Sequence, residues 1–238
     1  MTLKQRWKKI RPDVFAAATF WKQSVDNEGV RLSLKGASPL VRFAMLTGYE
    51  AEDARLCRKY IAPGDGVLEL GSSIGFIAIF CLKQVGVQNY AMVEANPALL
   101  PIMQENFKLN HVALPAYLNV AAGGVDGEAT FNVSRDYWAS SLNSVANAGD
   151  AVTVPVLTIP SIVAKLGFKP NVLVMDIEGA ETQIPLDHLA QFDKIIVEFH
   201  RRFVGDEPID NIIAGLEARG FTFMETDGLS SAFVKTAQ

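Results

Sequence analysis

The amino-acid sequence predicts an α/β fold, with a doubly wound, mostly parallel sheet, an antiparallel edge and an N-terminal helical extension. From residue 67 onward, short apolar runs alternate with segments of helical periodicity, as they do in βαβ units. The last two apolar runs have no helix-length segment between them, which favours a final antiparallel hairpin. A length of 238 residues fits one such domain with an extension.

The predicted extension covers residues 1–47, and its beginning is basic whereas the rest of the chain is acidic. Residues 1–22 carry six basic residues and one acidic residue, and the remainder carries 16 basic and 25 acidic residues. Its apolar residues recur at spacings typical of one helical face, namely Trp7, Ile10, Val14, Phe15 and Trp21. We expect a helix that packs on the domain or makes a weak contact with an anionic membrane surface. A short strand is expected at residues 30–34, where apolar and polar residues alternate.

The composition excludes several classes of protein. Hydrophobic residues make up 49% and charged residues 20%, as in ordinary soluble globular proteins. No apolar run reaches the roughly 18 residues of a membrane-spanning helix. The net charge of −4 argues against a nucleic-acid partner. The two cysteines, Cys57 and Cys81, show neither metal-ligand spacing nor a disulfide framework, so we expect a cytoplasmic protein.

A helix is expected at residues 50–60, and the turn Pro63-Gly64-Asp65-Gly66 ends it. The regular alternation of strands and helices begins after this turn. Strands of the main sheet are expected at residues 67–70, 90–94, 117–121, 172–175, 194–199, 221–225 and 232–235. Further helices are expected at residues 76–84, 98–110, 161–166, 181–189 and 210–219. An insertion over about residues 123–155 is expected to carry strands at 131–133 and 152–157.

A glycine-containing turn follows the first strand of this sheet, where the ligands of doubly wound folds bind. The segment reads Glu69-Leu70-Gly71-Ser72-Ser73-Ile74-Gly75-Phe76, and its two glycines allow the backbone to turn sharply and pass close to a ligand. Glu94 ends the next strand, 23 residues after Gly71, where an acid can accept hydrogen bonds from ribose hydroxyls. Each half alone also fits an ordinary βα turn with a surface acid, but the combination predicts a nucleotide-type site.

The spacing of the glycines argues against a dinucleotide or a triphosphate. A dinucleotide fingerprint requires glycines at its first, third and sixth positions, which here hold Gly71, Ser73 and Phe76. The lysine of a P-loop is also missing after Gly75. We therefore expect S-adenosylmethionine, with Glu69 near the ammonium of its amino-acid tail. The expected cofactor-binding residues are Glu69, Gly71, Ser72, Ser73, Gly75, Phe76, Glu94, Ala95, Asn96 and Asp176.

Four segments of the chain are together typical of one enzyme family. They are Val-Leu-Glu-Leu-Gly-Ser-Ser-Ile-Gly at 67–75, Val-Glu-Ala-Asn-Pro at 93–97, Asp-Ile-Glu-Gly-Ala-Glu at 176–181 and Ile-Val-Glu-Phe-His at 196–200. With Asn106, Asn110 and Ser140-Ser141-Leu142, they make the chain resemble the FkbM family of S-adenosylmethionine-dependent methyltransferases over roughly residues 48–225. The resemblance implies a Rossmann-like class I methyltransferase domain at residues 48–238. It also implies methyl transfer to an oxygen, often a hydroxyl of a sugar, glycan or polyketide-like molecule.

The chain departs from the family pattern at four places. Glu69 replaces a usual Asp, and Ser72-Ser73 replaces a usual Ala-Asn, which preserves charge or small size. Val174 stands where a Lys is frequent, and the segment Thr158-Ile159-Pro160 lacks a common Asp. The last two departures leave the contacts to the acceptor open.

Three residues are candidates for catalysis. Asp176 ends the fourth core strand, so we expect it to face the methyl group and to orient or deprotonate the acceptor hydroxyl. Glu178 follows in the next turn and can line the same crevice. His200, just past the fifth strand, is either a base or a structural, hydrogen-bonded histidine. Asp176 and Glu178 could bind a divalent cation, but the sequence establishes none and we expect no metal. Glu181 is expected to favour the start of the next helix through the helix dipole.

The insertion is the expected acceptor-facing segment. Its candidate substrate residues combine apolar rings with hydroxyl groups, as sugar binding requires, namely Tyr137, Trp138, Ser140 and Ser141. Trp138 alone also fits a core position. The leading prediction is thus an O-methyltransferase acting on a small-molecule or glycan acceptor. The alternatives are a catalytically degenerate binding module, a nucleotide-dependent oxidoreductase, which the glycine spacing disfavours, and a nucleic-acid methyltransferase, which the acidic body disfavours.

Overall fold

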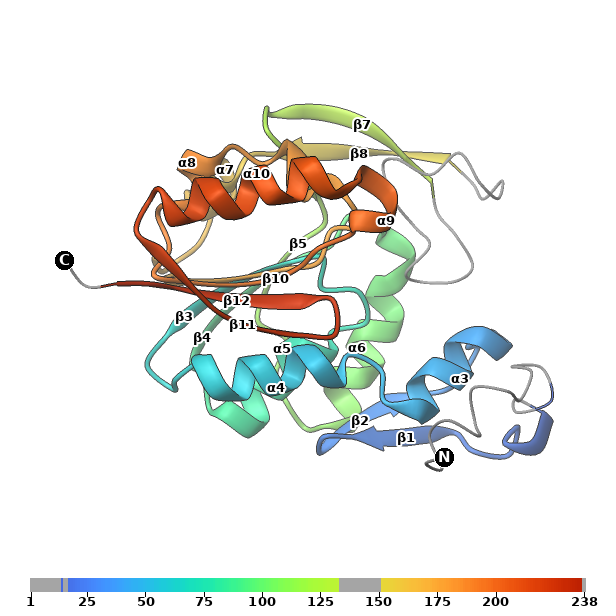
Figure 1. Ribbon diagram of the computed structural model, residues 1–238. Helices are drawn as coiled ribbons and strands as arrows, with labels where there is room; N and C mark the ends of the chain where they lie inside the picture. The colour runs from blue at the N-terminus through green and yellow to red at the C-terminus, as the bar shows by residue number, and fades with distance from the viewer. Residues whose placement is uncertain (1–13, 15–16, 133–150, 237–238) are drawn as a thin grey trace.

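A computed structural model describes residues 14, 17–132 and 151–236 of the protein (Figure 1). Its centre is a seven-stranded sheet with the strand order β11-β12-β10-β9-β3-β4-β5. These strands are β3 (Gly66–Leu70), β4 (Asn89–Val93), β5 (Ala116–Leu118), β9 (Val172–Met175), β10 (Lys194–Glu198), β11 (Phe221–Asp227) and β12 (Ser230–Lys235). The predicted doubly wound α/β fold is confirmed.

The order of the strands reverses between β3 and β9. β4 and β5 extend the sheet in one direction from β3, and the chain then crosses back to place β9 on the other side of β3. β12 runs antiparallel between β10 and β11. The predicted terminal hairpin is therefore present, but its antiparallel strand lies one place inside the edge, and β11 at the edge is parallel to the rest. The reversal point is where such sheets bind ligands.

Helices cover both faces of the sheet (Figure 1). One face carries α4 (Ala51–Tyr60), α5 (Phe76–Phe80) with a following π-helical turn (Cys81–Val85), and α6 (Leu100–Leu109). The other carries α7 (Ile159–Val163), α8 (Leu186–Leu189) and α10 (Asp206–Glu217), which follows the single turn α9 (Arg201–Val204). Successive strand residues alternate between the two cores: Val67 packs with the first set and Leu68 with the second. This alternation is the period of two that a β-strand imposes.

The N-terminal part packs onto the first of these cores. The hairpin of β1 (Ser24–Asn27) and β2 (Val30–Ser33) is followed by α3 (Pro39–Thr47). β2 lies within the strand predicted at 30–34, whereas β1 and α3 were not predicted. The Asn106 and Asn110 side chains, one helical turn apart on α6, accept hydrogen bonds from the backbone N–H groups of Ser33 and Arg31 at 2.8 and 2.9 Å. Most of the helix predicted around Trp7 to Trp21 lies outside the described residues.

The insertion forms a separate three-stranded sheet in the order β6-β8-β7. Its strands are β6 (Ala121–Ala122), β7 (Gly127–Asn132) and β8 (Ala151–Leu157), so the predicted pair of insertion strands is present. Short 3-10 helices over Pro97–Leu99 and Ala180–Gln183 complete the described elements. Within the described residues, no helix combines the length and apolarity needed to cross a bilayer.

Candidate functional site

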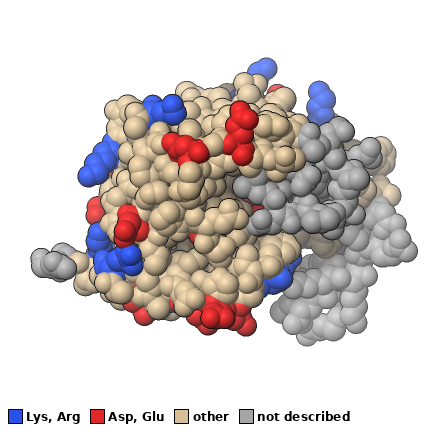
Figure 2. Space-filling view, turned by 90° about the horizontal axis from the view of Figure 1, so that it is seen from above, with Lys and Arg blue, Asp and Glu red and all other residues tan. Residues whose placement is uncertain are grey.

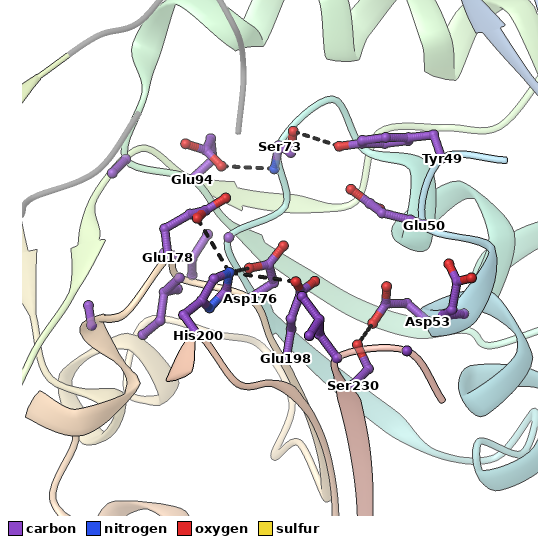
Figure 3. A pocket seen from close by; sticks show the side chains of 18 of the residues that line it. Tyr49, Glu50, Asp53, Ser73, Glu94, Asp176, Glu178, Glu198, His200 and Ser230 are labelled. Atoms are coloured by element: carbon purple, nitrogen blue, oxygen red, sulfur yellow. Dashed lines mark hydrogen bonds and ion pairs between the residues drawn. The ribbon is translucent and has the colours of Figure 1, made fainter. Parts of the chain in front are cut away.

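A cleft of about 500 Å³ opens at the carboxyl ends of β3, β4, β9 and β10, on the reversal point of the sheet (Figure 3). Two sets of residues face each other across it. We call Gly71, Ser73 and Glu94 the glycine wall, and Asp176, Glu178, Glu198 and His200 the acid wall. The topology produces this arrangement, because the carboxyl ends of parallel strands meet at one edge of a sheet.

Gly71 joins the two walls. Its φ is +86°, and a Cβ built on it would lie 1.7 Å from the carbonyl oxygen of Asp176. The N–H groups of Gly71 and Ser72 both donate to the carbonyl of Val93 at the end of β4. Gly71 lines the cleft as predicted, but its missing side chain makes room for the neighbouring strand end rather than for a ligand. Gly75, with φ +81°, does not line the cleft, and a Cβ there would meet the ring of Phe107 at 2.8 Å.

Glu94 holds the glycine wall together through backbone groups. One carboxylate oxygen accepts from the N–H of Ser73 at 2.8 Å, and the other accepts from the N–H of Asn96 at 2.7 Å. Burial raises the pKa of Glu94, and these backbone donors oppose the rise. Both oxygens are thus fixed in place, and each keeps acceptor capacity for a ligand hydroxyl. This is the position at which the sequence predicts contact with a ribose.

The structure divides the predicted cofactor residues into two groups. Gly71, Ser73, Glu94, Ala95 and Asp176 line the cleft. The others do not line it: Glu69, Ser72, Gly75, Phe76 and Asn96.

Of this second group, Asn96 caps the short helix after β4 and Phe76 packs in the core beside the ring of Tyr49. Glu69 is buried, accepts a hydrogen bond from the Tyr90 hydroxyl at 3.0 Å, and borders a small adjacent void that also touches Asp53 and Asp176. In this structure its carboxylate lies beneath the cleft rather than in it.

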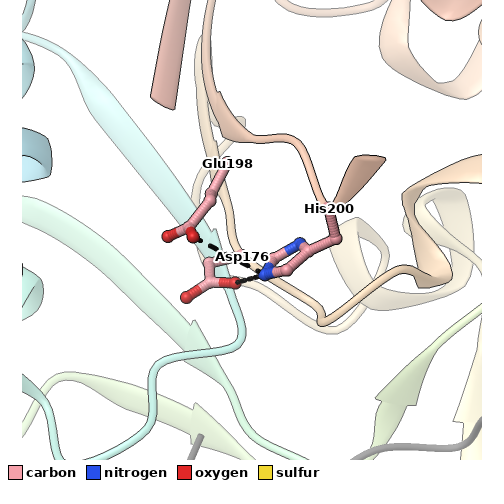
Figure 4. Close-up of side chains that lie close together, drawn as sticks. All are labelled: Asp176, Glu198 and His200. Atoms are coloured by element: carbon pink, nitrogen blue, oxygen red, sulfur yellow. Dashed lines mark ion pairs between the residues drawn. The ribbon is translucent and has the colours of Figure 1, made fainter. Parts of the chain in front are cut away.

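The acid wall surrounds one histidine (Figures 3 and 4). Nε2 of His200 lies 3.3 Å from Glu178 Oε2, 3.5 Å from Asp176 Oδ1 and 3.6 Å from Glu198 Oε1. The His200 side chain is only 2% exposed, whereas that of Asp176 is 36% exposed and faces the cleft. The three predicted catalytic residues therefore lie together, and Glu198, which was not predicted to have a role, is a fourth member of the group.

Glu181 fixes the orientation of this histidine. Its side chain is fully buried, and its Oε1 lies 2.9 Å from Nδ1 of His200 and 3.2 Å from the backbone N–H of Ile177. Because a carboxylate only accepts hydrogen bonds, Nδ1 carries the proton and Nε2 faces the other three carboxylates. Glu181 does lie in the first turn of the short 3-10 helix Ala180–Gln183, where the sequence predicts it, and it has in addition a buried contact with His200 that the sequence did not predict.

The electrostatics of the acid wall follow from this crowding. Burial, and then the charges of Glu198 and Glu178, hold the pKa of Asp176 well above its usual range. Burial likewise raises the pKa of Glu178 to about 7. Burial alone would lower the pKa of His200, but Glu181 and the other carboxylates outweigh it and raise that pKa. A site with this charge favours a cationic ligand.

Three residues before and within α4 also line the cleft, although no motif in the sequence marks them. Tyr49 contacts the Ser73 hydroxyl through its own hydroxyl at 3.2 Å, and Glu50 and Asp53 face the acid wall (Figure 3). Burial raises the pKa of Asp53 to about 6, although a hydrogen bond from Ser230 opposes it. They lie far in sequence from the other site residues, so only the folded chain brings them there.

Backbone strain marks the same cleft. Of the five described non-glycine residues in the left-handed region, which such residues rarely adopt, three are Glu50, Ser73 and Glu178, with φ values of 49°, 46° and 53°. All three line the cleft. Such strain is concentrated at binding and catalytic sites, because the surrounding structure must impose it.

The acceptor side of the cleft is described in part. The predicted substrate residues Tyr137, Trp138, Ser140 and Ser141 lie outside the described residues. Within the described chain, Arg202 and Leu229 line the cleft from α9 and the β11–β12 turn, and Leu229 is 55% exposed. On the molecular face shown in Figure 2, basic and acidic side chains are interspersed, in contrast to the one-signed acid wall.

Comparisons with solved structures give distant likenesses. The precorrin-6y C5,15-methyltransferase of Geobacter metallireducens is 11% identical, with a TM-score of 0.49, over 80% of this chain and 90% of that one. The methyltransferase FkbM of Methylobacillus flagellatus is 14% identical, with a TM-score of 0.46, over 73% of this chain and 44% of that one. The magnesium protoporphyrin IX methyltransferase of Synechocystis, solved with bound S-adenosylmethionine, is 16% identical, with a TM-score of 0.46, over 79% of this chain and 77% of that one.

Sequence comparison is more decisive than these structural likenesses. No curated protein sequence matches the chain. The profile of the methyltransferase FkbM domain, however, matches residues 71–223, which contain the glycine wall, the acid wall and the insertion. Because this match covers more than half of the chain, the protein belongs to the FkbM methyltransferase family.

Proposed function

We propose that this protein transfers a methyl group from S-adenosylmethionine to a hydroxyl oxygen of a sugar, a glycan or another small natural product. One observation carries the proposal. In a chain of the FkbM methyltransferase family, Glu94 and Asp176 face each other across a single cleft at the reversal point of the sheet. The cleft volume of about 500 Å³ lies within the range of pockets that hold molecules of cofactor size.

The charge of the cleft supports the choice of donor. S-adenosylmethionine carries a sulfonium and an ammonium, and the lining carboxylates of Glu50, Asp53, Asp176 and Glu198 suit both cations. Methyl transfer removes the sulfonium charge, so the product loses part of this attraction. The same wall that attracts the donor therefore favours release of S-adenosylhomocysteine.

The proposed reaction is an in-line displacement. The acceptor oxygen attacks the methyl carbon, the carbon–sulfur bond breaks, and its electron pair remains on sulfur as a neutral thioether. The hydroxyl proton passes to Asp176, a carboxylate that faces the cleft and whose raised pKa makes it a stronger base than an ordinary aspartate. Carboxylates that face the cleft also accept hydrogen bonds from further hydroxyl groups, which favours a polyhydroxylated acceptor.

The test has two steps. The purified protein is incubated with tritiated methyl donor and a metabolite or glycan extract, and the labelled product is identified. The variant Asp176→Asn is then assayed on that product's precursor, and we expect turnover to fall about 100-fold or more. Calorimetry with S-adenosylhomocysteine separates any weaker cofactor binding from the loss in turnover at saturating donor. Glu217→Gln, an exposed change on α10, is the matched control. Unchanged turnover in Asp176→Asn would overturn the role of this residue, and absence of donor binding would overturn the function.

A further inference from the structure

We propose that Asp176, Glu198 and His200 bind a divalent transition-metal ion of the manganese or zinc type, with Glu178 beside them. The role of the ion, to hold and polarise the acceptor hydroxyl, rests on the proposed function. Its binding does not, and can be measured without any methyl transfer. From the sequence, Asp176 and Glu178 were candidates for a cation, but Glu198 and His200 follow a different strand, β10, and only the fold brings them beside Asp176.

The distances between the candidate ligands fit one shared ion. One oxygen of Asp176, one oxygen of Glu198 and a nitrogen of His200 all lie within 4.8 Å of one another. Nε2 of His200 is 3.5 Å from the first and 3.6 Å from the second (Figure 4). Ligand atoms that each lie about 2.1 Å from a common ion are separated by about 3–3.5 Å in tetrahedral or octahedral geometry. The side chains therefore need only small adjustments to coordinate it.

Glu181 fixes the ring of His200 in the orientation and tautomer that a metal-binding histidine requires. It is fully buried and engages Nδ1 at 2.9 Å, which directs the Nε2 lone pair at the three carboxylates. Ligating histidines generally donate their other N–H to a carboxylate or carbonyl in this way, which fixes the tautomer and raises the basicity of the ligand nitrogen. A fully buried glutamate is costly unless it has such a partner.

The acid wall also contains polar atoms that the described protein leaves unsatisfied. Asp176 Oδ1 and Glu178 Oε2 are buried and have no hydrogen-bond partner among the described residues. The contacts of Nε2, at 3.3–3.6 Å, are longer than the hydrogen bonds of about 2.7–2.9 Å that charged groups form. A proton on Nε2 would balance the charge of one of the four surrounding carboxylates, whereas a divalent ion would balance two and would give the orphaned Asp176 oxygen a partner.

The donor set indicates the class of ion. One imidazole nitrogen with carboxylate oxygens suits Mn²⁺, Zn²⁺ or Fe²⁺, whereas Ca²⁺ prefers oxygen alone and Cu⁺ prefers sulfur. The partial exposure of Asp176 leaves open positions toward the cleft. An acceptor hydroxyl bound there would be polarised by the ion. The hydroxyl proton would pass to the Asp176 oxygen that does not coordinate the ion, while the acceptor oxygen attacks the methyl carbon.

Metal binding is measured on the full chain after dialysis against a chelator. Mn²⁺ is titrated, and the free ion is followed by electron paramagnetic resonance. We expect one saturable ion per chain, displaced by Zn²⁺, with affinity lowered about tenfold or more in Glu198→Gln and in Glu181→Gln. Glu217→Gln should bind as the wild type does. Thermal melting shows whether each variant is folded.

A second readout does not depend on the variants. Pulsed resonance on the wild-type Mn²⁺ complex should show coupling to an imidazole nitrogen, which His200 supplies. The absence of saturable binding of Mn²⁺ or Zn²⁺, the absence of nitrogen coupling, or unchanged affinity in a folded Glu198→Gln would each overturn the site. If the protein transfers methyl groups without binding an ion, the proposed function stands and the metal site fails. If it binds the ion at His200 but does not bind the methyl donor, the site stands and the proposed function fails.

Discussion

The glycine wall and the acid wall stand opposite each other but satisfy their polar groups in opposite ways. In the glycine wall, both oxygens of Glu94 accept backbone hydrogen bonds, from Ser73 and from Asn96. In the acid wall, Asp176 and Glu178 each keep a buried oxygen without a partner among the described residues. Buried polar groups are nearly always paired, so an unpaired cluster indicates a binding partner from outside the chain.

The difference teaches how one cleft can serve two purposes. A carboxylate fixed by backbone donors is rigid before any ligand arrives, which suits recognition of a constant group such as a ribose. A cluster of mutually repelling carboxylates is stabilised only when positive charge enters. We therefore expect substitutions in the glycine wall to lower the stability of the folded protein. Neutralisation of acids near the acid wall should instead raise its stability, because it removes charge repulsion.

The largest effect should come from the residue where the walls meet. Gly71→Ala places a Cβ 1.7 Å from the Asp176 carbonyl oxygen at a φ of +86°, so strand ends must separate. We expect a loss of about 4 kcal/mol or more in the free energy of unfolding, or failure to fold. Gly220→Ala is the matched control, because its φ is +85° and nothing lies within 4 Å of its Cβ. Equal losses in urea denaturation would show that backbone strain alone, and not the contact between the walls, makes Gly71 necessary.

The next largest effect should be a gain in stability, from the neutralisation of Glu69. Burial, opposed by the Tyr90 hydrogen bond and reinforced by Glu94 and Asp53, raises the pKa of Glu69 to about 8. Because the folded state holds this proton more tightly than the unfolded chain, the stability due to Glu69 is complete below its ordinary pKa of 4.5 and is lost as pH rises through about 8. Glu69→Gln cannot ionise and keeps an oxygen for Tyr90.

We expect Glu69→Gln to be more stable than the wild type at pH 9 by about 2–4 kcal/mol, with the difference vanishing near pH 4, since each pKa unit corresponds to about 1.4 kcal/mol. Urea denaturation across this range measures it, with the exposed change Glu105→Gln as control. A variant that is less stable than the wild type at pH 9 would contradict the electrostatic account. Calorimetry on the same variant tests the predicted contact with the cofactor ammonium.

The smallest effect should come from Glu94, whose two carboxylate oxygens both accept backbone hydrogen bonds. Glu94→Gln turns one acceptor oxygen into an NH₂ group that faces a backbone N–H, so one hydrogen bond is lost at each pH. We expect a loss of about 1–3 kcal/mol in stability and about tenfold weaker S-adenosylhomocysteine binding. Unfolding and calorimetry on the same sample measure both. A gain in stability would place Glu94 with the acid wall and remove the distinction between the two walls.

The sequence predicted the sheet well because its strands are buried on both faces and read as short apolar runs. Val172 to Met175 is fully apolar and is found as β9. It did not predict α3, whose Pro39–Thr47 segment has no acidic residue in its first turn and is apolar except for Arg42 and Thr47. It predicted an antiparallel edge but not which of the last two strands lies outermost, since strand order depends on contacts that no local pattern encodes.

The site was predicted where its residues lie in one motif and missed where tertiary structure assembles it. Glu94 and Asp176 follow strands and could be placed by topology. Tyr49, Glu50 and Asp53 precede or begin α4, and nothing local marks them as part of a cleft with His200. Glu181 was assigned to a helix start because burial and its 2.9 Å contact with His200 depend on the folded chain.

The position of β12 has a consequence for how the chain matures on the ribosome. This strand is wedged between β10 and β11, both translated before it, and its first residue, Ser230, closes one side of the cleft against Asp53. A nascent chain that has already made every acid of the cleft still exposes the long edges of two strands until the final hairpin emerges. The protein should therefore acquire affinity for its ligand only after β12 has been synthesised and has paired. Truncation before Ser230 should yield an inactive chain that aggregates through its unpaired strand edges, rather than a weaker enzyme.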